Sequence, residues 1–179
     1  MDEVELKRQL ERAHADCFGW AMACCGRDRD DAEEVLQTVY LTVLDGRARY
    51  DGRSSFRTWL FGVIRRTAAS ERRKTWLRGL LLKREADGLK PEAPDSPDAE
   101  LDRDARRHSL RHALAHLATR QREVLQLVFY HDLTVDEAAG VMGVSVGSAR
   151  THYARGKARL AVLLGDAKDF DNDGRERAS

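Results

Sequence analysis

All three prolines of this 179-residue chain, Pro91, Pro94 and Pro97, fall within one short acidic stretch, EADGLKPEAPDSPD. Proline lacks a backbone N–H and fixes its own φ angle, so this stretch interrupts the helical pattern. On either side of it Ala, Leu, Arg and Glu dominate, and these residues favour helices. We therefore predict an all-α protein, with two small helical domains joined by a flexible acidic linker.

The same break sets the predicted boundaries, with a first domain at 1–76, the linker at 77–97, a second domain at 98–165 and a polar tail at 166–179. Apolar spacing and capping residues predict three helices in the first domain. They cover residues 3–25, the stretch from Asp30 to about Leu44, and the stretch from Ser54 or Ser55 to about Lys74. In the second of these helices Leu41 and Leu44 lie outside the main apolar side. This placement predicts either full burial or a docked partner.

Four helices are predicted in the second domain, over roughly 98–117, from Thr119, from Thr134 and from Ser145 to about Leu164. Thr134 and Glu137 form a capping-box pattern. Gly143 suits a tight turn that needs positive φ, and Ser145 can cap the helix that follows it. The last two helices therefore match a helix-turn-helix.

The final helix separates apolar from cationic residues. Val146, Ala149, Tyr153 and Leu160 lie on one side, and Ser148, Arg150, Thr151, His152 and Arg155 lie toward the other. Arginine, threonine and serine side chains on a helix are suited to guanine edges and phosphates in a major groove. A basic surface helix of a bundle is the alternative. The capping box, the paired small residues Ala138 and Ala139 and the turn glycine Gly143, at consistent spacing, favour DNA reading.

The third helix of the first domain also has two faces. Phe56, Trp59, Leu60, Val63 and Ile64 form the predicted core face, whereas Thr58, Phe61, Arg65, Ala69 and Arg72 lie near the opposite side. An exposed aromatic ring among arginines suits unpaired bases and their backbone. Composition alone favours a solvated basic face with one exposed phenylalanine.

Charge is unevenly distributed although the formal net charge is only +1. Residues 65–84 hold eight basic side chains against Glu71, and residues 85–104 hold eight acids against Lys90 and Arg103. Local charge sets where a polyanion binds, so a nucleic-acid partner remains compatible with this total.

Several other classes are disfavoured. No apolar run is long enough to span a membrane, and the charged N-terminus is unlike a secretory signal, so we expect a cytoplasmic protein without membrane insertion. Cys17, Cys24 and Cys25 match no zinc spacing and are predicted as free thiols in the core. We find no phosphate loop, metal set or nucleophile–base pair, and so expect neither an enzyme nor a cofactor.

Two stretches together carry a family resemblance. DAEEVLQTVYLTVL followed by RYDGRSSFRTWLFGVIRR resembles region 2 of bacterial RNA polymerase sigma factors. The stretch LRHALAHLATRQREVLQLVFYHDLTVDEAAGVMGVSVGSARTHYARGKARL resembles region 4. With only a linker between them, the chain resembles the extracytoplasmic-function (group 4) sigma factors of the sigma-70 family. The resemblance implies a sigma region 2 helical bundle and a region 4 helix-turn-helix.

The resemblance also implies partners and roles. Core RNA polymerase would be contacted through its β′ clamp helices and β flap, with Glu34, Gln37 and Leu41 at the first of these. Recognition of the −35 element would use Ser148, Arg150, Thr151, His152, Arg155, Lys157 and Arg159. Binding of the −10 element would use Tyr50, Asp51, Arg53, Ser54, Ser55, Phe61, Arg65, Arg66 and Arg72. An anti-sigma factor is a further expected partner, beside promoter DNA.

Two functions therefore follow from the sequence. The first is a sigma factor that binds core RNA polymerase, recognises −10 and −35 elements and promotes DNA melting. The second is a stand-alone helix-turn-helix regulator of transcription, which would bind duplex DNA without polymerase.

Overall fold

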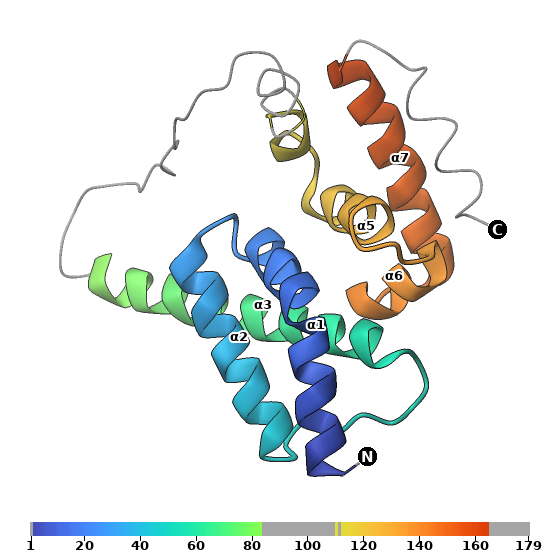
Figure 1. Ribbon diagram of the computed structural model, residues 1–179. Coiled ribbons are helices and arrows are strands. Elements are labelled where there is room, and N and C mark those ends of the chain that lie inside the picture. Colours follow the sequence, from blue (N-terminus) through green and yellow to red (C-terminus); the bar gives the residue numbers. More distant parts are fainter. Residues whose placement is uncertain (1, 84–109, 111, 165–179) are drawn as a thin grey trace, which may run out of the picture.

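The computed structural model describes residues 2–83, 110 and 112–164, and within these residues all regular structure is helical (Figure 1). The order is α1 (Glu3–Cys24), α2 (Arg29–Leu44), α3 (Phe56–Lys83), α5 (Thr119–Phe129), α6 (Val135–Met142) and α7 (Val146–Leu164). Residues 112–115 are helical as well. The prediction of an all-α fold is confirmed. We call α1–α3 the first helical group and α5–α7 the second helical group.

Capping side chains explain where the helices of the first group begin. Asp2 accepts a hydrogen bond from the Glu5 amide at 2.8 Å and starts α1. Asp28 accepts from the Asp31 amide at 3.0 Å and starts α2, slightly before the predicted start at Asp30. Ser55 caps α3 through the Thr58 amide at 3.1 Å. A short polar oxygen at each N-cap satisfies an amide that the helix itself leaves unpaired.

Helix α3 continues to Lys83, beyond the predicted end near Lys74. The helix therefore includes 77–83, which the sequence had assigned to the linker. These residues, LRGLLLK, are mostly strong helix formers, and the first proline comes later, at Pro91. The rest of the predicted linker, the first part of the 98–117 helix and the whole predicted tail lie outside the described residues.

The predicted helix-turn-helix is confirmed in its local geometry. Thr134 and Glu137 form a complete capping box at the start of α6. Gly143 ends that helix with φ 65°, in the left-handed region where glycine has no steric penalty. Ser145 then accepts from the Ser148 amide at 3.1 Å and starts α7. Gly156 lets α7 approach α5, since a Cβ there would lie 3.1 Å from the Leu125 Cδ1 atom.

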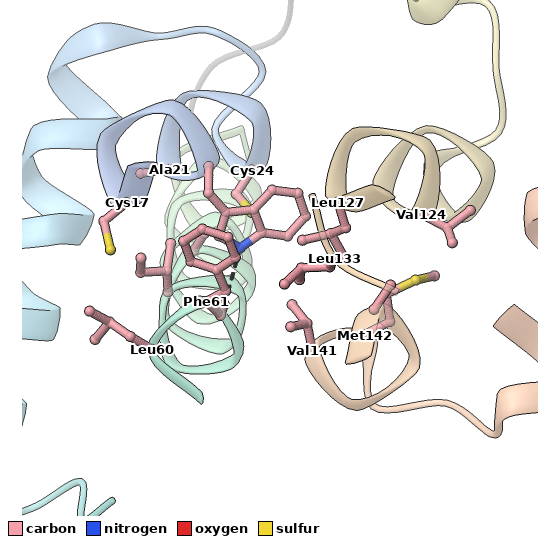
Figure 2. Close-up of a cluster of buried hydrophobic side chains, with 14 of the residues drawn as sticks. Cys17, Ala21, Cys24, Leu60, Phe61, Val124, Leu127, Leu133, Val141 and Met142 are labelled. Atoms are coloured by element: carbon pink, nitrogen blue, oxygen red, sulfur yellow. Dashed lines mark hydrogen bonds between the residues drawn. The ribbon is translucent and has the colours of Figure 1, made fainter. Parts of the chain in front are cut away.

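The core is continuous across both helical groups. Within the first group α1, α2 and α3 pack against one another, and within the second group α5, α6 and α7 do the same. Helix α3 also packs against α6, so the groups are in direct contact. Figure 2 shows Phe61, Cys24 and Ala21 on one side of this boundary and Leu127, Leu133 and Val141 on the other. All six side chains are buried.

The capping box at α6 should be measurable in stability. Thr134→Ala removes the oxygen that accepts from the Glu137 amide at 3.2 Å. We expect the free energy of unfolding to fall by about 1 kcal/mol. Urea denaturation followed by circular dichroism measures this change. Ser70→Ala, at an exposed position within α3, is the control and should change stability by less than about 0.5 kcal/mol. Equal effects of the two variants would contradict the capping role.

Candidate nucleic-acid interface

Helix α7 has a polar face that points away from α5 and α6. Ser148, Arg150, Thr151, Arg155 and Arg159 are exposed, while His152 and Lys157 are half-buried. The opposite face, formed by Ala149, Tyr153, Gly156 and Leu160, is buried. The predicted division of the helix therefore holds, except that Val146 is 36% exposed rather than part of the core. The exposed part of this face carries the positive charges of Arg150, Arg155 and Arg159.

Arg150 is positioned for a partner outside the chain. Its Nη2 atom lies 3.4 Å from the Asp136 carboxylate, and both side chains are more than half exposed. An ion pair this exposed contributes little to stability, so exchanging it for a base edge or a phosphate costs little. Thr151 donates its hydroxyl to the Gly147 carbonyl at 2.9 Å, which fixes its rotamer on the same face.

A compact loop precedes α3. The Tyr50 hydroxyl donates to the Ser54 carbonyl, and the Asp51 carboxylate accepts from the Arg53 amide at 3.2 Å. Gly52 takes φ 75° at the tip. The Tyr50 ring packs edge-on against Phe56 with centroids 5.5 Å apart. Asp51, Arg53 and Ser55 are exposed and Tyr50 and Ser54 are half-buried, so the loop forms an ordered polar rim beside α3.

Phe61 does not lie on an exposed face, contrary to the sequence prediction. Its side chain is fully buried. Its ring stacks on Trp20 of α1 at 6.0 Å and meets the His131 ring edge-on at 4.8 Å. Trp20 also donates its indole N–H to the Phe61 carbonyl at 3.1 Å. Helical periodicity identified a second face of α3 but could not show that the second group covers it. Thr58, predicted on the same face, is also buried.

Arg65 is likewise enclosed. Its guanidinium donates to both carboxylate oxygens of Glu123 on α5, from Nε at 3.2 Å and from Nη2 at 3.3 Å. The side chains retain only 16% and 12% exposure. Arg120 holds the same carboxylate at 3.2 Å. An arginine–carboxylate pair with two hydrogen bonds has a defined geometry, so this mostly buried pair fixes how the two groups are aligned. Either charge alone would be costly to bury.

The other two predicted cations of α3 are exposed, but one of them is tied to α1. Arg66 is exposed. Arg72 is exposed as a residue, but its Nη1 atom donates to the Cys24 carbonyl at 2.7 Å. That bond places a positive charge at the carboxyl end of α1, where it interacts favourably with the helix dipole. Arg72 therefore ties α3 to α1, a structural role that the sequence prediction missed.

His131 connects the two groups from the turn that follows α5. Its side chain is 3% exposed, and its ring lies edge-on to Trp20 at 5.8 Å. Arg57 of α3 donates to the His131 carbonyl at 3.0 Å and to Asp16 of α1 at 3.0 Å. Burial lowers the pKa of His131 to about 4, and the nearby Asp16 and Asp132 carboxylates only partly oppose this. The ring is therefore neutral at physiological pH.

The outer face of α2 is exposed where polymerase contact was predicted. Glu34 and Gln37 are exposed, and Leu41 is 52% and Leu44 42% exposed. Val35, Leu36, Val39 and Val43 on the other side are buried. The exposed leucines exclude full burial of this helix. The docked partner, the other outcome that the sequence allowed, stays a prediction.

The cysteines show no reactive character. All three are free, and Cys17 and Cys24 are buried as predicted. Burial raises the pKa of Cys17 to about 12 and that of Cys25 to about 11, so the thiols stay protonated. Within the described residues no group of three or more His, Cys, Asp or Glu side chains could hold a metal ion. None of the described helices has the length and apolar character to cross a membrane.

Two parts of the chain match two regions of one family. Residues 10–78 match Sigma-70 region 2, and residues 107–160 match Sigma-70, region 4. The ECF RNA polymerase sigma factor SigC of Mycobacterium tuberculosis is 30% identical over 155 residues, covering 87% of this chain and 80% of that protein. The chain belongs to the sigma-70 family, in its extracytoplasmic-function group. It is a sigma factor that acts in transcription initiation.

Further similarities agree with this family. The sigma factor CarQ of Myxococcus xanthus is 33% identical over 137 residues, which cover 75% of each chain. Among solved structures, RpoE from Bartonella quintana, in complex with the anti-sigma factor NepR, has a TM-score of 0.69 at 21% identity. That match covers 90% of this chain and 97% of that chain. CnrH, in complex with the cytosolic domain of CnrY, has a TM-score of 0.61 at 22% identity, covering 92% and 90%. At such identities the likeness shows a shared fold.

Some residues at the contact between the two helical groups could not be identified from the sequence. Glu123 and His131 of this sigma factor contact the first group, yet neither belongs to a recognisable motif. Glu123 lies in a charged helical stretch, RQREV, and His131 lies in a turn. The only available signal was the polar–aromatic composition of YHD directly after an apolar helix.

His131 should titrate abnormally while the two groups are in contact. While the two groups are in contact, the pKa of His131 is about 4, below the ordinary 6.5. A lowered histidine pKa stabilises the contact above pH 6.5, and this stabilisation is lost as pH falls toward 4. At pH 5 the contact should therefore be weakened about 30-fold relative to pH 8.

Proton NMR of the histidine ring signals measures this pKa, with His131→Gln used to assign the resonance. An ordinary pKa for His131 would mean that its ring is exposed to water in solution.

Proposed function

We propose that this sigma factor is a dissociable subunit that binds core RNA polymerase, recognises −10 and −35 promoter elements and promotes DNA melting. The observation that carries the proposal is the division of surfaces. A cationic helix face on α7 belongs to one group, and a polar loop with arginines along α3 belongs to the other. Duplex reading and strand opening need different surfaces, and one chain supplies both.

The −35 element would be read by α7. In the major groove, Arg150 and Arg155 would reach base edges, with Ser148, Thr151 and His152 beside them. Lys157 and Arg159 lie further along the helix and would contact phosphates. Exposure of these arginines supports the assignment, because none must break a buried contact before binding.

The −10 element would be bound as a melted strand. The loop Tyr50–Ser55 would receive an unstacked base, and Arg66 would neutralise the backbone. Phe61 and Arg65 are covered by the second group. We therefore propose that they contact DNA only after the two groups separate. Removing bases from the stack costs a few kcal/mol each, so pockets and stacking rings are required.

Polymerase would be contacted at both groups. The exposed face of α2, with Glu34, Gln37 and Leu41, would dock on the β′ clamp helices, and the second group would contact the β flap. We propose residues 1–83, to the end of α3, and residues 98–165 as the two working domains, with 84–97 passing between them and 166–179 as a tail. The protein would act in the cytoplasm.

An anti-sigma factor is a further proposed partner. The sigma factor RpoE, which has a similar fold, was solved in complex with the anti-sigma factor NepR, and CnrH was solved in complex with the cytosolic domain of CnrY. The exposed apolar residues Leu41 and Leu44 on α2 are a surface that such a partner could cover. The presence of both region 2 and region 4 in one chain favours the sigma-factor function over the stand-alone regulator.

Reconstituted transcription tests the proposal. The purified chain is added to core RNA polymerase on genomic fragments, and transcript ends are mapped. We expect discrete starts that core polymerase alone does not produce. Transcription no different from that of core alone would refute the proposal. Sequence-specific binding to duplex DNA in the absence of core would favour the regulator instead.

Arg150→Ala should separate base reading from phosphate contact. If Arg150 reads a base, the variant should lose about 1–3 kcal/mol of promoter binding and relax the preference at one −35 position. Arg159→Ala is the matched comparison and should weaken binding to all promoters equally. Binding of the polymerase complex to a library of −35 variants measures both effects. Uniform weakening by Arg150→Ala would reduce it to a phosphate contact.

A further inference from the structure

Two histidines lie side by side at the end of the short helical segment that precedes α5. His112 and His116 are four residues apart, and their ring centroids are 4.2 Å apart with the planes tilted by 39°. Residues at this spacing share one face of a helix. Ala113 and Leu117 of the same turn are buried, whereas both histidines are exposed to solvent. The pair is separate from the DNA and polymerase contacts proposed above.

A hydrogen bond determines which nitrogen of His116 can bind a ligand. The Nδ1 atom lies 2.8 Å from the His112 carbonyl oxygen, which can only accept, so Nδ1 carries the proton and donates it. The His116 backbone amide donates to the same carbonyl at 3.2 Å. In the neutral ring the free lone pair is then on Nε2. Metal-binding histidines are typically held in this way, because the second hydrogen bond orients the ring and raises the basicity of the ligating nitrogen.

The spacing of the two rings fits a single metal ion. Imidazole nitrogens bind Zn²⁺ at about 2.0–2.1 Å, so two imidazoles on one ion have ring centroids roughly 4.5–5 Å apart. The observed 4.2 Å needs only a small rotation of the side chains to reach that range. Two histidines at i and i+4 on one helix face are also the spacing that zinc-binding helices use. Simple packing of two rings at a helix end is the alternative, and it predicts no response to metal.

We propose that His112 and His116 bind one divalent metal ion of the class that imidazole ligands favour, such as Zn²⁺, Ni²⁺ or Cu²⁺. In the described part of the chain no group of three or more His, Cys, Asp or Glu side chains forms a metal site, so water fills the remaining positions on the ion. Structural zinc has four protein ligands, and this site is therefore exchangeable rather than required for folding.

The bound ion has a structural consequence. It joins two residues one turn apart, in a segment whose Ala113 and Leu117 side chains belong to the core. An ion that binds the folded chain and not the unfolded chain raises the stability of the folded state. Metal binding therefore stabilises the segment that leads into α5.

Isothermal titration calorimetry with Zn²⁺, on the full-length chain without a histidine tag, tests the proposal. Every protein carries His108→Gln, because His108 would otherwise offer a second pair with His112 at the same sequence spacing. Every protein also carries Cys25→Ser, which removes a half-buried thiol. We expect one ion per chain. His112→Gln and His116→Gln should each weaken binding at least about tenfold, since losing even an outer hydrogen bond to a ligating histidine costs about 10–100-fold in affinity.

A displaced histidine separates the geometry of the pair from the number of histidines. His112→Gln combined with Ala115→His keeps that number and uses an exposed position. Neighbouring residues on a helix do not face each other, so this variant should bind as weakly as His112→Gln alone. His14→Gln is the matched control, because it removes an exposed histidine of α1 whose ring contacts the Tyr40 hydroxyl at 3.0 Å. It should leave the affinity unchanged, and circular dichroism verifies folding of each variant.

NMR of the histidine rings then locates the ion. Zn²⁺ should shift the signals of His112 and His116 and leave that of His131 in place, and excess EDTA should reverse the change. The midpoint of thermal unfolding should rise with Zn²⁺ in the parent protein but not in His112→Gln. Equal affinity of the parent and the displaced-histidine variant would show adventitious binding only and would overturn the proposal. Absence of Zn²⁺ binding by the parent protein would overturn it as well.

Discussion

The packing of Phe61 between Trp20 and His131 is the contact on which the arrangement of the whole molecule depends. Trp20 and Phe61 belong to the first helical group and His131 to the second, and all three side chains are almost completely buried. Because the cluster takes its rings from both groups, separating the groups would expose part of it to water. Joining the groups removes aromatic and aliphatic surface from water, which is the main driving force available to such a contact.

Polar interactions then determine how the groups are oriented. Apolar surfaces attract without strong directional preference, whereas the Arg65–Glu123 pair and the Arg57 bridge each demand a defined geometry. The free energy of these polar contacts also behaves differently from that of the apolar contact. A buried ion pair gains little over solvated charges when formed, but separating it without new partners is expensive. A contact of this type opens when another anion, such as a DNA phosphate, can replace the carboxylate.

Much of the fold could be predicted from local sequence signals. The capping box at Thr134, the turn at Gly143 and the cap at Ser145 depend on neighbours three residues away, and all are present in the structure. The exposed face of α7 followed from helical periodicity for the same reason. The extension of α3 to Lys83 was missed because charged and leucine-rich residues were given to the linker.

The burial of Phe61 and Arg65 could not be predicted in the same way. Periodicity divides a helix into faces, but it does not say whether a second face meets solvent, DNA or another part of the chain. That answer depends on contacts between residues far apart in sequence, such as Arg65 with Glu123. The sequence therefore identified the face of α3 that carries Phe61 and Arg65 as unusual. The prediction that this face is exposed was wrong.

The central claim is that the two groups are packed together in the free protein. The most direct measurement is a nuclear Overhauser experiment on the isolated chain at neutral pH, with selectively labelled phenylalanine and histidine. The ring centroids of Phe61 and His131 are 4.8 Å apart, so the account predicts cross-peaks between the two rings. Cross-peaks from His131 only to residues of its own group, such as Tyr130, would show that the groups are separate in solution and would contradict the account.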